Sequence, residues 1–154
     1  MGDSEEEDTR TLGEYMEQLQ NPDKFKEAQC VFECASRYSD NPDAIGGLWL
    51  GGFWSTMDVT TLVQNNIHCV LTLNGRPPTW TSKRFSHALK ERGVNIRSIA
   101  LDLEDTIHQD ITSHFDHCFN VISKELDHGH GILVHCTAGR SRSATVVIAY
   151  LVAK

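Results

Sequence analysis

Apolar residues recur along the chain in short runs that alternate between strand-like and helix-like spacing. The runs at 48–50, 67–73 and 132–134 are short and almost continuously apolar, as expected for strands buried on both faces. Residues 94–100 alternate apolar with polar side chains and predict a half-covered strand. Helical spacing is found at 12–38, after Ser55, around 85–89, at 110–126 and at 144–151. This alternation predicts an α/β fold with a mainly parallel central sheet and helices on both faces.

The helical faces expected to point inward are defined by their apolar residues. The helix after Ser55 or Thr56, either of which can serve as its N-cap, should bury Val59, Leu62 and Val63. The next helix should bury Phe85 and Leu89. The inward residues of the helix at 110–126 are Ile111, Phe115, Cys118, Phe119 and Ile122. Residues 39–47 contain Asn-Pro and Gly-Gly pairs and predict a turn-rich connection.

The first 46 residues differ from the rest of the chain. Residues 1–10 are strongly acidic and predict a disordered, solvated tail. Residues 11–46 predict a helical extension broken at Asn21-Pro22, in which one helical face carries Phe25, Ala28, Phe32 and Ala35. Residues 47–154, which carry the alternating strand and helix patterns, are expected to form one folded domain.

Charge and cysteine content narrow the classes of partner. The 154-residue chain is 40% apolar and carries a net charge of −7, of which residues 1–10 contribute −4 and the remainder −3. A mildly acidic domain argues against nucleic acid as a partner. No apolar run approaches spanning length and the N-terminus is acidic, so no membrane association is expected. Five cysteines without a secretion signal predict reduced thiols in the cytosol or the nucleus.

The candidate chemistry lies where the strand at 132–134 leads through a small-residue loop into the helix at 144–151. Helix N-termini bind anions because their first N–H groups have no intrahelical partner. Cys136 opens this loop and Arg142 closes it. The helix terminus and the guanidinium would both lower the pKa of the thiol, and Arg142 would pair bidentately with a phosphate. Gly139 allows close approach of the backbone to such a ligand.

Residues 135–143, with the sequence HCTAGRSRS, resemble the signature loop of cysteine-dependent protein tyrosine phosphatases. The Ala-Gly pair and the Ser-Arg-Ser ending are most similar to the dual-specificity branch, and the resemblance extends from about residue 47 to the C-terminus. It implies a protein-tyrosine-phosphatase-like fold and hydrolysis of phosphotyrosine and phosphoserine or phosphothreonine in phosphoproteins. It also implies a cysteinyl-phosphate intermediate and no metal or other cofactor.

The resemblance also implies a role for each loop residue. Cys136 is the nucleophile and Arg142 holds the phosphate. His135 organises hydrogen bonds beneath the loop and helps to keep Cys136 ionised, and Ser143 stabilises the departing thiolate. The remaining substrate-binding positions contribute mainly backbone amides; they are Thr137, Ala138, Gly139, Arg140 and Ser141.

A carboxylic acid must protonate the leaving group, and the acidic stretch after Ala100 follows a predicted strand end, where such sheets bind ligands. Spacing alone leaves Asp102, Glu104 and Asp105 open. In the dual-specificity family the acid stands five residues before a helix opening, which selects Asp105.

Other interpretations remain open. A phosphoinositide or an RNA 5′-phosphate would be hydrolysed by the same chemistry, although the loop lacks the lysines of lipid-type relatives and the acidic charge disfavours RNA. A phosphoprotein-binding module with little turnover is the third alternative, because the chain ends at Lys154, before the helices that the family pattern normally continues with. Cys30 and Cys34 are expected to pack in the core and not to bind metal, and His128 and His130 are expected in a solvated turn.

Overall fold

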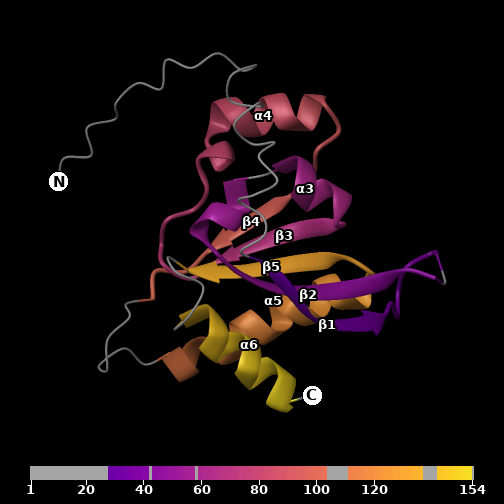
Figure 1. The fold of residues 1–154 in the computed structure, drawn as a ribbon, viewed down its shortest axis with the longest axis vertical. Coiled ribbons are helices and arrows are strands. Elements are labelled where there is room, and N and C mark those ends of the chain that lie inside the picture. The colour runs from indigo at the N-terminus through magenta and orange to yellow at the C-terminus, as the bar shows by residue number, and fades with distance from the viewer. Residues whose placement is uncertain (1–27, 42, 58, 104–110, 137–141, 154) are drawn as a thin grey trace.

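The computed structural model describes residues 28–41, 43–57, 59–103, 111–136 and 142–153. They form a five-stranded sheet in the order β1-β2-β5-β3-β4 (Figure 1). The strands are β1 (Gln29–Ala35), β2 (Ile45–Gly52), β3 (Ile67–Thr72), β4 (Arg97–Ala100) and β5 (Gly131–Cys136). All neighbouring pairs are parallel except β1 with β2. The predicted α/β class with a mainly parallel sheet is therefore confirmed.

Helices cover both faces of the sheet (Figure 1). On one face lie η1 (Phe53–Met57), α3 (Val59–Gln64), η2 (Thr79–Thr81) and α4 (Lys83–Glu91), and on the other lie α5 (Phe115–Asp127) and α6 (Arg142–Ala153). A short turn of 3₁₀ helix, η3 (Ile111–His114), precedes α5. None of the described helices combines the length and apolar character that a membrane crossing needs.

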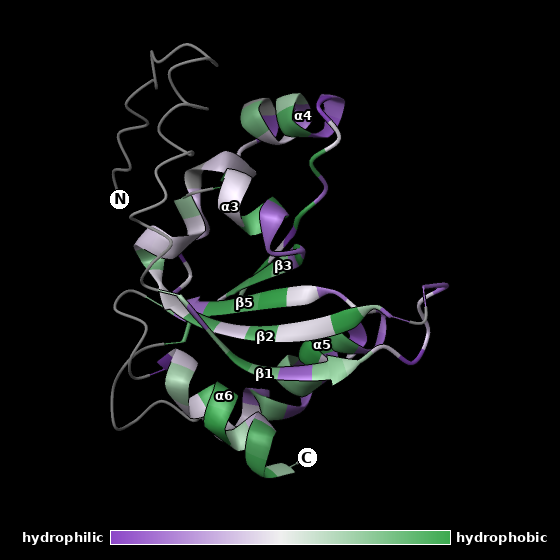
Figure 2. Ribbon diagram, turned by 45° about the vertical axis from the view of Figure 1, so that its right-hand side comes forward, coloured by the Kyte–Doolittle hydropathy of each residue, from purple (hydrophilic) through white to green (hydrophobic). Residues whose placement is uncertain are grey.

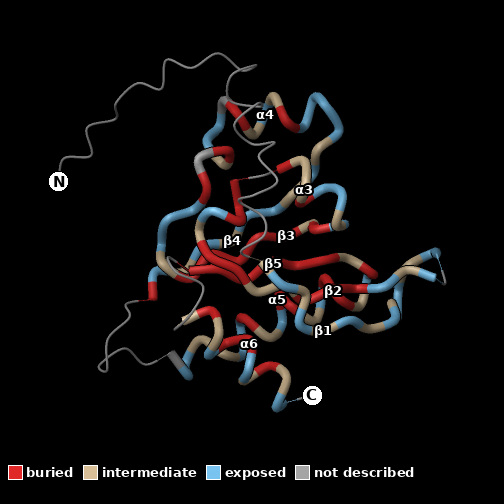
Figure 3. The backbone as a smooth tube through the Cα atoms, viewed as in Figure 1, coloured by how far each residue is buried: buried red, intermediate tan, exposed pale blue. Residues whose placement is uncertain are grey.

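β5 lies at the centre of the core, and all six of its residues are buried (Figure 3). Its side chains alternate between the two faces, as in any strand. Ile132, Val134 and Cys136 join the apolar cluster under α5 and α6, whereas Leu133 joins the cluster under α3 and α4. Both β5 and α6 are hydrophobic over most of their length (Figure 2), which is why these two elements anchor the loop between them.

The helix predicted across residues 22–38 is wrong for Gln29–Ala35, which form the edge strand β1. Phe32 and Ala35 do not share a face there, because burial alternates strictly along the strand. Cys34 packs against the larger apolar cluster, whereas Cys30, which precedes a register shift in β1, pairs with Trp49 and is half-buried. The acidic segment 1–10 and the start of the predicted extension lie outside the described residues.

The other predicted elements are found, with small shifts at their ends. β2 extends beyond 48–50 to Ile45–Gly52, and its start needs Gly46 because a Cβ there would lie 2.6 Å from the Leu126 carbonyl oxygen. Val63 points outward with 48% exposure, contrary to expectation, while Val59, Leu62, Phe85 and Leu89 are buried. On α6, Ile148 and Val152 are exposed.

A charged cluster lies at the end of the sheet opposite Cys136, where α5 meets β3, β4 and the start of β5. The carboxylate of Glu125 is only 7% exposed and forms ion pairs with Arg97 and with His130 Nδ1. The His130 ring stacks on His68 with 3.8 Å between ring centroids. The solvated turn predicted for His130 is therefore wrong, since this residue is half-buried and paired. His128 is exposed as predicted.

A second buried polar contact joins β3 to β5. Thr72 Oγ1 lies 2.7 Å from His135 Nε2, and neither residue is exposed. Burial lowers the pKa of His135 from its usual 6.5 to about 4, because the charged imidazolium would lose its hydration. His135 is therefore neutral at physiological pH.

The Glu125 cluster predicts a clear difference between two glutamate variants. Glu125→Ala removes a buried carboxylate with two partners and should lower the free energy of unfolding by about 2 kcal/mol, because Arg97 then loses its counter-charge and His130 its hydrogen-bond partner. Glu91→Ala is the control, since Glu91 pairs with His87 on an exposed helix surface and should cost less than about 0.5 kcal/mol. Urea unfolding measures both values, and equal effects would contradict the assigned role of Glu125.

The low pKa of His135 predicts acid sensitivity of the fold. The unfolded chain binds a proton near pH 6.5 and the folded chain only near pH 4, so stability is fully present above pH 6.5 and falls as pH is lowered toward 4. Between about pH 7.5 and 5 the loss due to this residue should be about 2 kcal/mol. Urea unfolding of wild type and His135→Asn at both pH values isolates this contribution. A stability difference between the two proteins that does not change with pH would contradict it.

Candidate active site

Cys136 stands at the carboxyl end of the central strand, where β2 and β3 also end. Gly52 at the end of β2 pairs with Cys136, and Thr72 at the end of β3 pairs with His135. This edge of a parallel sheet is where α/β proteins bind ligands. The helix α6 begins at Arg142, so its N-terminus belongs to the same loop connection as the cysteine. Residues 137–141, which include the predicted phosphate-binding positions Thr137 to Ser141, lie outside the described residues.

The sulfur of Cys136 lies 3.3 Å from the hydroxyl oxygen of Ser143, in the first turn of α6. Both residues are buried, with Cys136 only 2% exposed. The structure therefore brings together Cys136 and Ser143, two of the residues singled out from the sequence.

Arg142 is half-buried and its side chain reaches across to the segment after β4. Its Nη1 donates a hydrogen bond of 2.7 Å to the carbonyl oxygen of Leu103. Its Nε is buried and has no hydrogen-bond partner among the described residues. A buried donor of this kind is costly unless it finds an acceptor, and an oxyanion beside Cys136 would supply one.

His135 lies directly behind Cys136, on the opposite face of β5. It is held by Thr72 and by the ring of Phe53, whose centroid is 6.4 Å away. Because its imidazole is neutral, it can influence Cys136 through hydrogen bonding and packing but not as a nearby cation. Thr72 was not singled out from the sequence, although a threonine at the end of a buried strand was the available signal.

Of the three candidate acids, only Asp102 lies within the described residues. Its carboxylate lies against the turn after β3, such that a Cβ on Gly75 would be 2.8 Å from Oδ1. The next side chain, Leu103, is 1% exposed and packs in the same cluster as Cys136. Asp105 and Glu104 follow immediately and fall outside the described part.

The remaining thiols of the core do not resemble nucleophiles. Burial raises the pKa of Cys69 to about 12 and that of Cys118 to about 11. Both thiols therefore stay protonated at neutral pH. Among the described residues, no group of three or more side chains of the metal-ligating types converges on one point.

The chain resembles several phosphatases along most of its described length. A probable dual specificity protein phosphatase of Dictyostelium discoideum is 34% identical over 112 residues, which are 73% of this chain and 46% of that protein. Dual specificity protein phosphatase 12 of Mus musculus is 32% identical over 105 residues, 68% of this chain and 29% of that protein. The chain thus spans less than half the length of these two relatives.

Solved structures show the same fold. The crystal structure of DUSP15 matches with a TM-score of 0.56 and 30% identity, covering 68% of this chain and 59% of that one. A human tyrosine phosphatase-like serine/threonine/tyrosine-interacting protein matches with a TM-score of 0.58 and 25% identity, covering 70% and 68%.

The family described as "Dual specificity phosphatase, catalytic domain" matches residues 48–154. That range begins inside β2 and includes the whole of the site, from the strand that carries Cys136 to the helix that begins at Arg142. The chain belongs to the dual-specificity phosphatase family.

Proposed function

We propose that this chain hydrolyses phosphate monoesters of phosphoproteins, on tyrosine and on serine or threonine, through a phosphorylated Cys136. The observation that carries the proposal is the placement of Cys136 at the end of the central strand, 3.3 Å from Ser143 and beside the N-terminus of α6. Family membership supports the same reaction. A reducing compartment, such as the cytosol or the nucleus, would keep this thiol active.

The first step forms a bond between Cys136 Sγ and phosphorus and breaks the bond from phosphorus to the substrate oxygen. Arg142 pairs with two phosphate oxygens, and the amides of the loop and of the first turn of α6 bind the remaining charge. The departing alkoxide or phenoxide takes a proton from a carboxylic acid. Water then attacks phosphorus, the same carboxylate accepts its proton, and the sulfur leaves as a thiolate stabilised by the Ser143 hydroxyl. No step in this sequence calls on a metal ion.

Asp105 is the acid we favour. The carbonyl of Leu103 is held by the Arg142 guanidinium, and two residues of chain reach no farther than about 7 Å from that point. The chain is therefore short enough for Asp105 to reach the group that would bind the phosphate. The Asp102 carboxylate, by contrast, lies against Gly75 on the other side of Leu103.

Hydrolysis of an aryl phosphate, phosphotyrosine and phosphoserine peptides and a phosphoinositide tests the proposal. Cys136→Ser should abolish turnover, and Cys30→Ser, which changes a half-buried thiol on β1, should not. Asp105→Ala should lower kcat by about 10²- to 10³-fold, because the leaving group is no longer protonated. Asp102→Ala should lower it less than about threefold.

Each alternative has its own signature in this assay. A preference for the phosphoinositide over all peptides would assign the chemistry to a lipid substrate. Peptide binding without turnover by the wild type would indicate a binding module. A larger effect of Asp102→Ala than of Asp105→Ala would move the acid to Asp102.

The contact between Cys136 and Ser143 predicts a change in the rate-limiting step. Ser143→Ala should slow hydrolysis of the cysteinyl phosphate by about tenfold or more, since a hydrogen bond to the departing thiolate is lost. Rapid-mixing assays should then show a burst of alcohol or phenol before slow turnover. Ser123→Ala, which removes a hydroxyl bonded to Tyr150, is the control and should show no such burst. A uniform slowing of both phases in Ser143→Ala would contradict this role.

A further inference from the structure

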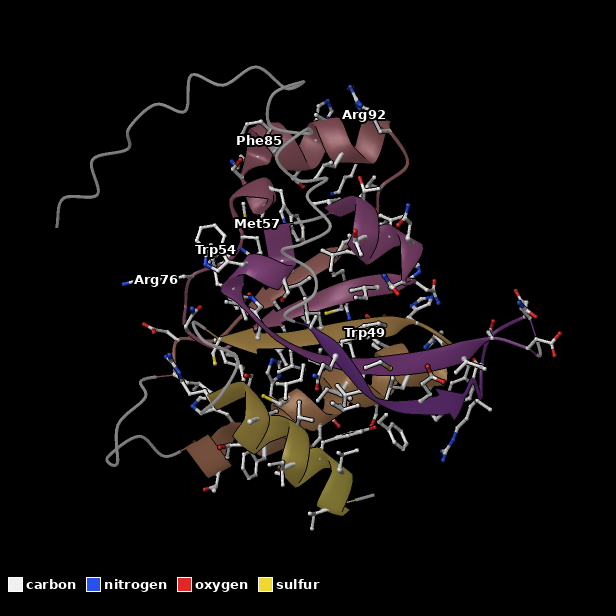
Figure 4. All side chains as sticks on the ribbon, viewed as in Figure 1. Trp49, Trp54, Met57, Arg76, Phe85 and Arg92 are labelled. Atoms are coloured by element: carbon white, nitrogen blue, oxygen red, sulfur yellow. The ribbon has the colours of Figure 1, made fainter. Side chains whose placement is uncertain are left out.

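Two large side chains, Trp54 and Arg76, lie at the sheet edge that carries Cys136. Trp54 belongs to η1, two residues after Gly52, which pairs with Cys136. Arg76 lies in the turn after β3, the strand on the other side of β5. Figure 4 shows both side chains extending outward at the edge where β5 ends, on the side of the sheet covered by α3 and α4. Neither residue was singled out from the sequence.

The segments that carry these side chains are held firmly. The Phe53 ring contacts both the Trp54 ring, at 5.6 Å, and the His135 ring, at 6.4 Å between centroids. Trp80 Nε1 donates a hydrogen bond of 2.7 Å to the Thr56 carbonyl, which joins η2 to η1. Trp54 is thus connected through one ring to the residue preceding Cys136.

The turn that carries Arg76 is held in a similar way. Asn74 Oδ1 accepts a hydrogen bond of 3.0 Å from the Arg76 amide, and the Gly75 amide donates one of 3.0 Å to the Leu101 carbonyl. Gly75 adopts a φ of +69°, a conformation that glycine tolerates best. Arg76 therefore leaves the sheet in a defined direction.

The chemistry of the two side chains is complementary. Trp54 is 52% exposed, and an indole offers a broad apolar face for a peptide side chain or an aromatic ring. Arg76 is exposed and forms no ion pair with any described residue, Asp102 included. Its guanidinium can pair with a carboxylate through two hydrogen bonds. An otherwise acidic chain thus presents an exposed cation in the turn after β3, the strand beside the one that carries Cys136.

We propose that Trp54 and Arg76 form a substrate-recognition rim that binds the peptide flanking the phosphorylated residue. The rim favours phosphopeptides with an acidic residue near the phosphate, read by Arg76, and an apolar side chain that packs on Trp54. This inference rests on the proposed function, because it takes Cys136 as the reacting centre.

The test compares phosphopeptides that differ at one flanking position. One series carries an aspartate at each position in turn on either side of the phosphorylated residue, and a matched series carries a lysine there. The ratio of kcat/KM for the aspartate and lysine peptides measures the charge preference. Wild type should prefer aspartate at one or two positions by about fivefold, and the preference should weaken as salt is added.

Variants assign the preference to a residue. Arg76→Ala should reduce the ratio to near one and Arg76→Glu should reverse it, whereas Arg92→Glu, at the C-terminal end of α4 (Figure 4), should leave it as in wild type. Trp54→Ala should raise KM for peptides with a flanking leucine by about fivefold, with kcat little changed. Tyr38→Ala, which removes an aromatic side chain that is 67% exposed in the turn between β1 and β2, is its control.

Failure of the recognition rim can be distinguished from failure of the proposed phosphatase activity. Binding of the same peptides to Cys136→Ser measures recognition without turnover, and the aspartate preference should be lost when Arg76→Glu is added. If wild type hydrolyses the peptides but Arg76→Glu and Arg92→Glu change the ratio equally, the proposed recognition rim is wrong, whereas the proposed phosphatase activity is supported. If wild type hydrolyses none of them, the proposed function fails, and binding to Cys136→Ser alone decides the rim.

Discussion

The burial of β5 between two parallel neighbours is the constraint on which the site depends. A strand buried on both faces and paired along both edges cannot shift its register without exposing apolar side chains. Cys136 is the last residue of that strand, and its position is therefore fixed by core packing and not by the loop that follows. Ser143 is fixed in the same way by α6, whose apolar side packs on the sheet through Val146, Val147 and Tyr150.

Polar contacts then connect this rigid base to the groups that would handle the phosphate. The Arg142 guanidinium joins the start of α6 to the segment after β4, so the cation and the chain that carries the acid are held together. The Thr72–His135 pair fixes the face of β5 turned away from the sulfur. Burial keeps His135 neutral, so this residue adds no positive charge beside Cys136. The low pKa of His135 also makes the stability of the fold sensitive to acid.

Much of this arrangement could be predicted from local patterns, and the failures have physical causes. The strand at 67–73 and the signature strand were recognisable because continuous apolar runs of that length have few other solutions. β1 was missed because Phe25, Ala28, Phe32 and Ala35 fit a helical face. The competing signal was the alternation that makes Cys30, Phe32 and Cys34 less exposed than the residues between them. Residues 29–35 form a strand and not a helix because they pair with β2, and pairing with a distant strand cannot be read from a local pattern.

Contacts between distant segments could not be predicted at all. The hydrogen bond from Arg142 to Leu103 and the packing of Phe53 against His135 depend on the order of strands in the sheet. The same is true of Glu125, which reads as a helix-surface residue in sequence but is buried between Arg97 and His130. The cysteine and arginine were found because their spacing is local to one loop. The residues that support them lie in β3, in η1 and in the segment after β4, and were visible only in the fold.

The central claim is that the sulfur of Cys136 carries the phosphoryl group during turnover. Mass spectrometry of protein quenched in acid within milliseconds of mixing with an aryl phosphate tests this directly. The account predicts one added phosphoryl group per chain, located on the peptide that contains Cys136 and absent from Cys136→Ser. Sustained hydrolysis with the phosphoryl group on another residue, or on none, would contradict it.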